Sequence, residues 1–489
     1  MTHRQIFLTL MGLLGLILLP GMLTSCISDA MTTSPRDVLT FSRDTVSFDT
    51  VFTDLGTPTA RLIVSNRAKK GINISSIRFR NPDTRFRMNV DGQSGTDFRD
   101  VEIRGKDSIY VFIECCIPET AGNEPTLVED QLEFVTNGVT QNVLCEAWGQ
   151  NVTRLRGVTF DRDTRLTTER PYVVFDSLVV APDVRLSVDP GVKLLFHDKA
   201  YMRVEGVLEA VGAPGKMIDM RGDRLDNVLP DVEYDIMAGQ WGGIRFGAGS
   251  FGNRMEYVDM RSTAYGVQVD SCADLSRTKL TLYNSWLHNS QQRVLSVRHA
   301  KVDAIGTCFS EAAFATVYLR GGEHDFLQCT FANNYLFSAI SEPLVMLEDV
   351  LPGAEDNSGL PLMKAEFLNC ILYGIPADLN VEDLTGSQVY FRNCSFKSKI
   401  TDDDNFLNCL GDTDPMFLTI RPEYYFNYRL GNDSPVKEAG NPEFVTPAAR
   451  TDMDGVDRLK SGNPSLGAYQ YVPVPEDDKV KSRRLPRQK

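Results

Sequence analysis

A short motif that recurs at nearly equal steps constrains the fold of this chain most. An apolar run with a cysteine at its centre occurs as "FLNCILYG" and again as "FRNCSFKS". Aligned positions occur in steps of 23, 21, 41 and 24 residues, and the long step contains an insertion near residues 342–361. The positions are Ser285, Cys308, Cys329, Cys370 and Cys394. A period in the low twenties, with short strands and no helical pattern, is typical of a parallel β-solenoid whose turns stack on one another.

The cysteines of this series are predicted to lie inside the solenoid. Equivalent positions of successive turns form columns with a spacing of about 4.8 Å. A free cysteine is a compact hydrophobe, so we expect an interior ladder of reduced thiols. The ladder comprises Cys308, Cys329, Cys370 and Cys394. Asn369 and Asn393 precede two of these cysteines and are expected to stack at a bend. A thiolate metal site is the alternative, but burial raises the pKa of a thiol and no histidine shares the column.

The region before residue 154 has a different pattern of apolar and polar residues. Six short runs alternate between apolar and polar residues, and turn residues such as "NPD" and "NG" separate them. The runs are "RLIVSN", "ISSIRFR", "FRMNV", "SIYVFIECCI", "DQLEFVTN" and "QNVLCEAWG". About seven strands in about 110 residues is typical of a sandwich. We therefore predict an immunoglobulin-like β-sandwich over residues 40–153 that acts as a spacer.

The first 25 residues have the pattern of an export signal, with a short basic start, an apolar stretch and small residues at its end. The ending "LTSC", residues 23–26, resembles the bacterial lipobox, which implies cleavage before Cys26 and a lipid on that cysteine. No other segment approaches the roughly 18 apolar residues that span a bilayer. We expect a mature chain attached to a membrane by lipid on Cys26, with residues 26–39 as a tether.

Charge and motif content exclude several classes of function. The formal net charge is −14, and because the first 25 residues carry one arginine and no acid, the remainder carries −15. This balance argues against a nucleic-acid partner, which needs a basic surface. The five histidines and the cysteines lack the spacing of a zinc site. No nucleophile elbow or phosphate-binding glycine loop is present.

Longer motifs show a resemblance to a known family. "GVKLLF", "YMRVEGVLEAVG" and "WGGIRF" resemble the right-handed parallel β-helix family of exported bacterial proteins, which includes pectate-lyase-like folds. The motifs "DTDPMF", "YRLGNDSPVKEAGN", "DMDGVDR" and "NPSLGAYQY" resemble a closing module called a choice-of-anchor Q domain. The resemblance implies an all-β chain with a β-helix over 154–435 and a closing segment over 436–472. We expect a disordered charged tail over 473–489. Because members differ widely in activity, it implies no particular reaction.

Polar columns on the outside of the predicted helix supply the candidate site residues. Alignment of "GVQVD", "VLSVR" and "TVYLR" stacks Asp270, Arg298 and Arg320. His288 and Glu311 each lie three residues after an aligned position and are the candidate acid–base couple. The alternative is a solvated face with interleaved charges, because any solenoid places polar residues in columns.

An acidic turn near the C-terminus is a candidate calcium site. Asp452, Asp454 and Asp457 lie within "DMDGVD", but the glycine is misplaced for an EF-hand loop. A simple turn is the alternative interpretation. We expect no other cofactor.

Together these features predict a monomeric, lipid-anchored envelope protein at the outer membrane or cell surface of a Gram-negative bacterium. An extended face of the β-helix would bind a polysaccharide, with Arg298 and Arg320 holding carboxylate or sulfate groups. Two alternatives stay open. One is a polysaccharide lyase or glycoside hydrolase on the same face, and the other is a structural surface protein without a small ligand.

Overall fold

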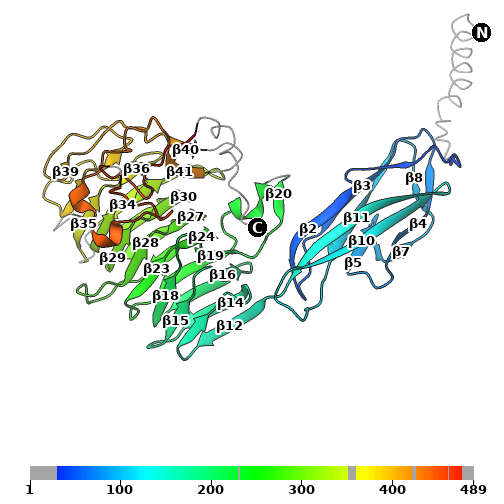
Figure 1. The fold of residues 1–489 in the computed structure, drawn as a ribbon, viewed down its shortest axis with the longest axis horizontal. Helices are drawn as coiled ribbons and strands as arrows, with labels where there is room; N and C mark the ends of the chain where they lie inside the picture. The colour runs from blue at the N-terminus through cyan, green and yellow to red at the C-terminus, as the bar shows by residue number, and fades with distance from the viewer. Residues whose placement is uncertain (1–29, 230–231, 351–359, 421–425, 461, 476–489) are drawn as a thin grey trace, which may run out of the picture. The chain divides into compact units, whose positions relative to one another are not determined.

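The computed structural model is all-β and consists of two compact units, residues 1–150 and 151–489 (Figure 1). It describes residues 30–229, 232–350, 360–420, 426–460 and 462–475. The predicted export signal, Cys26 and residues 476–489 of the predicted tail lie outside the described residues. Within the described part of the chain, no helix has the length and apolar character needed to cross a membrane.

The first unit contains two sheets that share one apolar core. One sheet has the order β1 (Leu39–Phe41), β3 (Ala60–Asn66), β9 (Ser108–Cys115), β5 (Phe86–Val90) and β6 (Gln93–Gly95). The other has the order β2 (Thr45–Phe52), β11 (Val139–Gln150), β10 (Thr126–Thr136), β4 (Ile72–Phe79) and β7 (Asp97–Phe98), with β8 (Val101–Ile103) also on β4. All six runs predicted from the sequence are strands, and their buried and exposed residues alternate, as along β9. The pairing of β2 with β11 is parallel.

Part of the predicted tether is attached to this first unit. Met31 forms an isolated bridge with Gly71, and the N–H of Thr32 donates to the carbonyl of Gly71 at 2.8 Å. The side-chain amide of Asn137 donates to the carbonyls of Ser34 and Asp37, both at 3.1 Å. Residues 31–37 are therefore held against the unit rather than forming a free linker, because a distant turn satisfies their backbone groups.

The second unit is built of coils with three strands each. One coil contains β26 (Leu280–Tyr283), β27 (Trp286–Ser290) and β28 (Leu295–Arg298), and the next contains β29 (Lys301–Ile305), β30 (Cys308–Ala312) and β31 (Val317–Arg320). Every strand pairs in parallel with its counterpart in the next coil. Among the described residues this stacking produces parallel sheets of 16 and 10 strands, which is consistent with a β-helix. Figure 1 shows these strands side by side along the unit.

The 16-stranded sheet has two arms that meet at β14 (Tyr172–Val180), which pairs with β16 and β17 through different residues. We name the first the β27 arm: β16 (Lys193–Phe196), β19 (Ile218–Gly222), β24 (Val258–Thr263), β27, β30, β33 (Thr330–Ala332), β36 (Ile371–Tyr373) and β38 (Ser395–Phe396). We name the second the β28 arm: β17 (Tyr201–Val204), β22 (Gly243–Phe246), β25 (Val267–Val269), β28, β31 and β34 (Val345–Glu348). β12 (Thr153–Phe160) pairs with β14.

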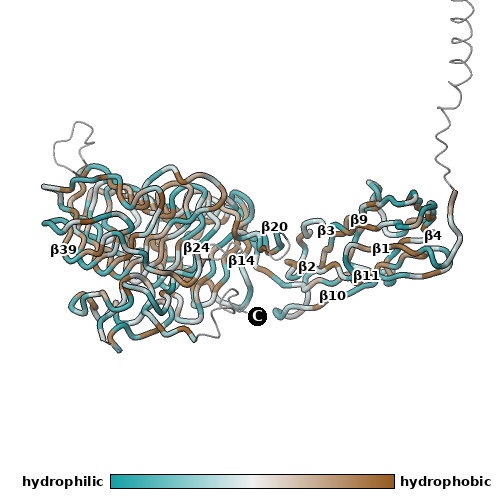
Figure 2. Tube along the Cα trace, turned by 90° about the horizontal axis from the view of Figure 1, so that it is seen from above, coloured by the Kyte–Doolittle hydropathy of each residue, from teal (hydrophilic) through white to brown (hydrophobic). Residues whose placement is uncertain are grey.

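The 10-stranded sheet closes the coils. Its order is β13 (Thr164–Leu166), β15 (Arg185–Val188), β18 (Val207–Val211), β23 (Asn253–Glu256), β26, β29, β32 (Gly322–Leu327), β35 (Leu362–Leu368), β37 (Val389–Arg392) and β39 (Phe406–Leu407). Phe326, Phe367, Phe391 and Phe406 share one register position, and their rings stack at centroid distances of 4.8, 4.5 and 5.1 Å. The cysteine motif alone does not predict this interior stack. Apolar and polar residues alternate along the coils (Figure 2).

The predicted cysteine ladder is present for three of its four members. Cys329, Cys370 and Cys394 each precede paired residues of adjacent coils and are fully buried. Each thiol donates to the carbonyl two residues earlier, at 3.5, 3.3 and 3.4 Å. Cys409 continues this pattern with a contact of 3.7 Å to the carbonyl of Leu407. None of the nine described cysteines forms a disulfide, and burial raises the pKa of Cys370 well above its usual value.

Cys308 does not belong to this ladder. Its register partner is Trp286, so the residue aligned with Ser285 is Thr307. The hydroxyls of Ser285 and Thr307 donate to the carbonyl two residues earlier, at 2.9 and 3.2 Å, as the ladder thiols do. The predicted alignment was wrong by one residue because the local requirement is a small side chain that donates to this carbonyl. Threonine and serine meet this requirement as well as cysteine does.

The residue before each ladder position adopts a left-handed backbone, with φ of 52° at Asn369 and 51° at Asn393. Asparagine tolerates this conformation, so the predicted bend is confirmed. That their side-chain amides also stack stays a prediction. The Asn369 side chain donates to the carbonyl of Asn441 at 2.9 Å and accepts from its N–H at 2.8 Å. It therefore fixes a C-terminal segment at this bend.

We name that segment the C-terminal strap, the described part of residues 414–475. It begins with an antiparallel pair, β40 (Phe417–Ile420) and β41 (Phe426–Leu430), which belongs to neither parallel sheet. The described residues 414–420 and 426–435 therefore belong to the strap and not to the predicted helix. Apolar strap residues pack on the outer face of the β27 arm against Cys308, Ala332 and Ile371. They are Phe417, Tyr428, Leu430, Val436, Met453, Leu466, Ala468 and Tyr469.

Candidate functional site

A groove with a volume of about 260 Å³ lies on the outer face of the β28 arm. Its residues come from β22, β25, β28, β31, the turns that precede β25 and β28, and the position directly after β25. They are Arg245, Tyr265, Gln268, Val269, Asp270, Gln292, Arg293, Ser296, Arg298 and Tyr318. Two of these, Asp270 and Arg298, are residues that the sequence pattern predicted for a binding face.

The strand register explains why polar groups gather in this groove. Successive strand residues point to opposite faces of a sheet, so an apolar residue that packs inside alternates with a polar residue outside. Arg245, Gln268, Ser296 and Tyr318 are register partners in four successive coils. The groove is therefore lined by a row of side chains that advances by one coil at each step.

Two of the three groove arginines are already paired with acids. The Nε of Arg245 lies 3.2 and 2.9 Å from the carboxylate oxygens of Asp270. Arg293 binds Glu342 through two nitrogens, at 2.7 and 2.5 Å, and its guanidinium lies 3.9 Å from the ring centroid of Tyr318. The charge of each of these two guanidinium groups is therefore already balanced by a neighbouring acid.

Arg298 differs from both. Its side chain is exposed, and it has neither an ion pair nor a hydrogen bond with any described residue. It follows Val297, a buried residue at the end of β28, so the strand alternation directs it outward. Within the described structure, the groove thus presents one uncompensated guanidinium.

Arg320 lies outside the groove although it is the register partner of Arg298. Its Nε lies 3.3 Å from Asp349 and 3.7 Å from Glu348. Glu348 also accepts a hydrogen bond of 2.5 Å from the hydroxyl of Tyr318. Burial and this hydrogen bond raise the pKa of Tyr318 to about 12. The predicted stacking of the two arginines is correct, but Arg320 is engaged by neighbouring acids.

His288 and Glu311 do not share the predicted row, although the charge of His288 acts on the Glu311 carboxyl and tends to lower its pKa. His288 pairs in register with Ser310, so Glu311 lies one position further and does not share its row. Both residues lie on the β27 arm, and neither lines the groove that contains Arg298. The error follows directly from the misaligned Cys308.

Glu311 is enclosed by the C-terminal strap. It is 3% exposed, and one of its oxygens accepts a hydrogen bond from the hydroxyl of Tyr428. The other oxygen is buried without a hydrogen-bond partner among the described residues. Burial raises the pKa of Glu311 to about 7. This carboxyl is therefore part of the strap contact and is not accessible to an extended ligand.

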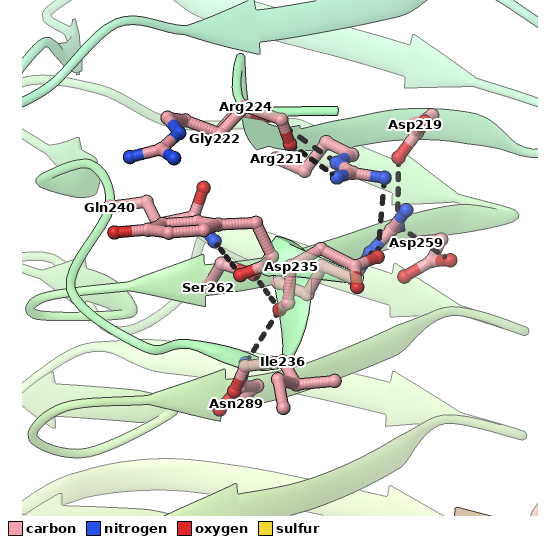
Figure 3. Close-up of polar contacts among 12 residues, drawn as sticks. Asp219, Arg221, Gly222, Arg224, Asp235, Ile236, Gln240, Asp259, Ser262 and Asn289 are labelled. Carbon is pink, nitrogen blue, oxygen red and sulfur yellow. Dashed lines mark hydrogen bonds and ion pairs between the residues drawn. The ribbon is translucent and has the colours of Figure 1, made fainter. Parts of the chain in front are cut away.

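A charged network covers the beginning of the β27 arm (Figure 3). Arg261 lies 2.8 Å from Asp219, 2.9 Å from Asp259 and 3.0 Å from Asp235. Arg221 reaches Asp235 at 3.2 Å. Burial tends to raise the pKa of Asp259, but Arg261 and His288 outweigh it and hold this pKa well below its usual value. The sequence pattern does not predict this network, because only the coil register brings these residues together.

The same network fixes a loop that contains β20 (Asn227–Leu229), β21 (Val232–Glu233) and the 3-10 helix η2 (Tyr234–Ile236). The carbonyl of Asp235 accepts hydrogen bonds from Ser262 at 2.5 Å and from Asn289 at 2.9 Å, as Figure 3 shows. His288 extends the network, with its Nε2 3.0 Å from Asp259 and its ring 4.0 Å from that of Trp286. Each acid has a cationic partner, which is the arrangement that buried charges require.

The candidate calcium ligands face different partners. The carboxylate of Asp452 accepts hydrogen bonds from three backbone N–H groups, at 3.0, 2.7 and 2.8 Å. Asp454 pairs with Arg429 at 2.5 Å and Asp457 pairs with Arg450 at 2.7 Å. Within the described ranges, no group of three or more His, Cys, Asp or Glu residues could hold a metal ion. The contacts of these three acids are those of a stabilised turn.

Comparisons with known proteins give little information about this chain. No protein-family model matches it, and no curated protein sequence does. A protein of unknown function from Porphyromonas gingivalis is similar over 26% of this chain and 60% of its own, with 11% identity and a TM-score of 0.18. A family 123 glycoside hydrolase from Clostridium perfringens is similar over 23% of this chain and 26% of its own, with 10% identity and a TM-score of 0.17. This chain thus spans less than two thirds of either protein, and TM-scores this low support no inference.

Proposed function

We propose that this protein binds a glycan in the groove on the outer face of the β28 arm. The observation that carries the proposal is the composition of the groove. Tyr265, which is 49% exposed, lies among amide, hydroxyl and guanidinium groups. A sugar ring presents apolar C–H groups on its faces and hydroxyls at its edge. Such a ring needs an exposed aromatic side chain together with a few polar groups that fix its orientation.

The repeat of the coils favours an extended ligand. Polar groups recur along the groove from Arg245 to Tyr318 because these residues are register partners. Coils follow one another at about 4.8 Å, so a chain molecule laid across them meets a new set of side chains at each step. A glycan chain has this form.

The acid content of the groove favours binding over hydrolysis. Glycoside hydrolysis generally requires two carboxyl groups that flank the scissile bond. Asp270 is the one acid among the described residues that line the groove, and it is paired with Arg245. His288 and Glu311, the predicted acid–base couple, lie on the other arm. We therefore favour a binding protein over the lyase or hydrolase alternative.

A glycan microarray tests the proposal. The soluble chain from residue 27 onward should bind a defined subset of glycans, and Tyr265→Ala should weaken this binding at least about tenfold through loss of the stacking surface. Tyr110→Ala in the first unit removes a tyrosine of similar exposure, 44%, and should bind as the wild type does. Absence of binding by the wild type, or unchanged binding by Tyr265→Ala, would contradict the proposal.

We also propose that the protein belongs to the envelope of a Gram-negative bacterium and is attached through lipid on Cys26. The "LTSC" motif supports this attachment. Cys26→Ser should release the protein from the membrane fraction, and a variant that remains as tightly bound as the wild type would exclude a lipid anchor.

The finer description of both units is likewise a proposal. The orders β1-β3-β9-β5 and β2-β11-β10-β4 agree with the two sheets of an immunoglobulin-like sandwich and support that class for the first unit. The parallel coils of the second unit support a right-handed β-helix, because parallel crossovers are almost always right-handed.

A further inference from the structure

We infer that the groove selects a glycan with a single acidic group and that Arg298 binds this group. The inference rests on the proposed glycan binding and adds the chemical class of the ligand. It depends on which guanidinium groups along the β28 arm remain available.

The charges of the groove leave one cation for a ligand. Arg245 is paired with Asp270, and Arg293 uses two nitrogens to bind Glu342. An anion at either position would lie beside a carboxylate that already balances the charge of the arginine. Arg298 is exposed and has no such partner among the described residues. Its planar guanidinium can form two parallel hydrogen bonds with a carboxylate or a sulfate.

The neighbouring coils argue against a ligand with many charges. The residue next to Arg298 in the preceding coil is Asp270, and the residue in the following coil is Arg320, which Glu348 and Asp349 already neutralise. A second acidic group one coil away would therefore meet a carboxylate. The net charge of −15 beyond the first 25 residues also repels a polyanion at long range.

Groups suited to the rest of a sugar surround Arg298. Tyr265 offers its exposed ring, and Gln268 and Ser296 are register partners that line the same groove. An acidic sugar held by Arg298 can thus contact a stacking surface and hydroxyl partners at the same time. This arrangement differs from a row of cations for successive charges, because only one of its positions is cationic and free.

A microarray with matched glycans tests the inference. It should hold neutral, singly carboxylated, singly sulfated and polyanionic members of the same backbones. We expect the wild type to prefer singly acidic glycans and Arg298→Ala to lose at least about tenfold affinity for them, so that its preference over the neutral counterparts disappears. Arg298→Lys should recover part of the preference. Arg320→Ala, the matched control one coil away, should bind as the wild type does.

The possible outcomes separate this inference from the proposed function. An acid preference that survives Arg298→Ala, a wild type that prefers polyanions, or equal binding of neutral and acidic glycans would overturn the inference and leave glycan binding intact. Absence of binding to every glycan would overturn both. Equal melting temperatures of the variants and the wild type would show that the differences arise in the groove and not from unfolding.

Discussion

The two arms of the 16-stranded sheet come from consecutive strands of the same coils but differ in what lies on their outer faces. The strap and the loop around η2 cover the β27 arm, whereas the β28 arm carries an open groove. Cys308 lies on the outer face of the β27 arm and is fully buried. Tyr265, beside the β28 arm, is 49% exposed.

The arginines of the two arms differ in exposure and in the number of acids that they contact. On the β27 arm, Arg261 is 14% exposed and contacts three acids. On the β28 arm, Arg245 is 55% exposed and contacts one. A buried charge needs a partner of opposite charge, while an exposed ion pair contributes about 0–1 kcal/mol to the free energy of unfolding. Columns of polar residues therefore occur on both arms. They stabilise the fold where the strap and the loop around η2 cover them, and they remain available to a ligand where nothing described covers them.

The largest expected difference between the arms is in the stability that is lost when an arginine of each arm is replaced. Arg261→Met should lower the free energy of unfolding by about 3–5 kcal/mol, because it leaves Asp219 without its cationic partner and removes one of the two partners of Asp235 and of Asp259. Arg245→Met, its counterpart on the β28 arm, should change it by about 1 kcal/mol or less. Urea unfolding followed by circular dichroism measures both. Similar effects of the two substitutions would contradict the distinction between covered and open arms.

The buried Glu311 should make stability depend on pH. Burial raises its pKa from 4.5 to about 7 in the folded chain, so the folded state retains a proton that the unfolded state releases. The contribution of Glu311 is then fully present below pH 4.5 and is lost as pH rises through about 7, a change on the order of 3 kcal/mol. Acids with lowered pKa, such as Asp259, have the opposite sign and lose their contribution at acidic pH.

Comparison with Glu311→Gln isolates this effect. The difference in the free energy of unfolding between wild type and Glu311→Gln, measured from pH 4 to pH 8, should become less favourable to the wild type as pH rises. A difference that does not vary over this range would show that the carboxyl is not enclosed by the strap.

A pair of tyrosine–glutamate contacts offers a finer comparison. Tyr428→Phe should lower the free energy of unfolding by about 1–2 kcal/mol, because Glu311 is almost fully buried and water cannot replace the lost hydroxyl. Tyr318→Phe removes the corresponding contact with Glu348, which is 35% exposed and can be hydrated, so its effect should be smaller. Thermal unfolding of the two variants checks the order, and a larger effect of Tyr318→Phe would reverse the comparison.

The smallest expected effect on stability is at the groove itself. Arg298→Ala should change the free energy of unfolding by less than about 0.5 kcal/mol, because an exposed side chain without a partner contributes little to folding. Calorimetry of the isolated variant measures this change. A clear loss of stability would mean that Arg298 has a structural role and that the open arm is not free for a ligand.

Much of the architecture could be predicted from local patterns. The period of the cysteine motif predicted stacked parallel coils, and the alternating runs before residue 154 predicted strands of the first unit. The register of Arg298 with Arg320 could also be predicted, because each arginine is the last residue of a strand with the same short pattern, "VLSVR" and "TVYLR". The one-residue error at Cys308 arose because serine, threonine and cysteine are interchangeable at that position.

The sequence by itself determined the coil period, the alternation of buried and exposed residues and the position of the ladder, because these depend on neighbouring residues and on one repeat length. Only the tertiary structure decided which outer face is covered. Tyr428 contacts Glu311 across 117 residues, and Asp452 accepts a hydrogen bond from Asn284 across 168. No local pattern in either segment specifies its partner, since each contact exists only after the strap has folded back onto the stacked coils. That cover turns one polar column into a buried network and leaves the other as the candidate binding groove.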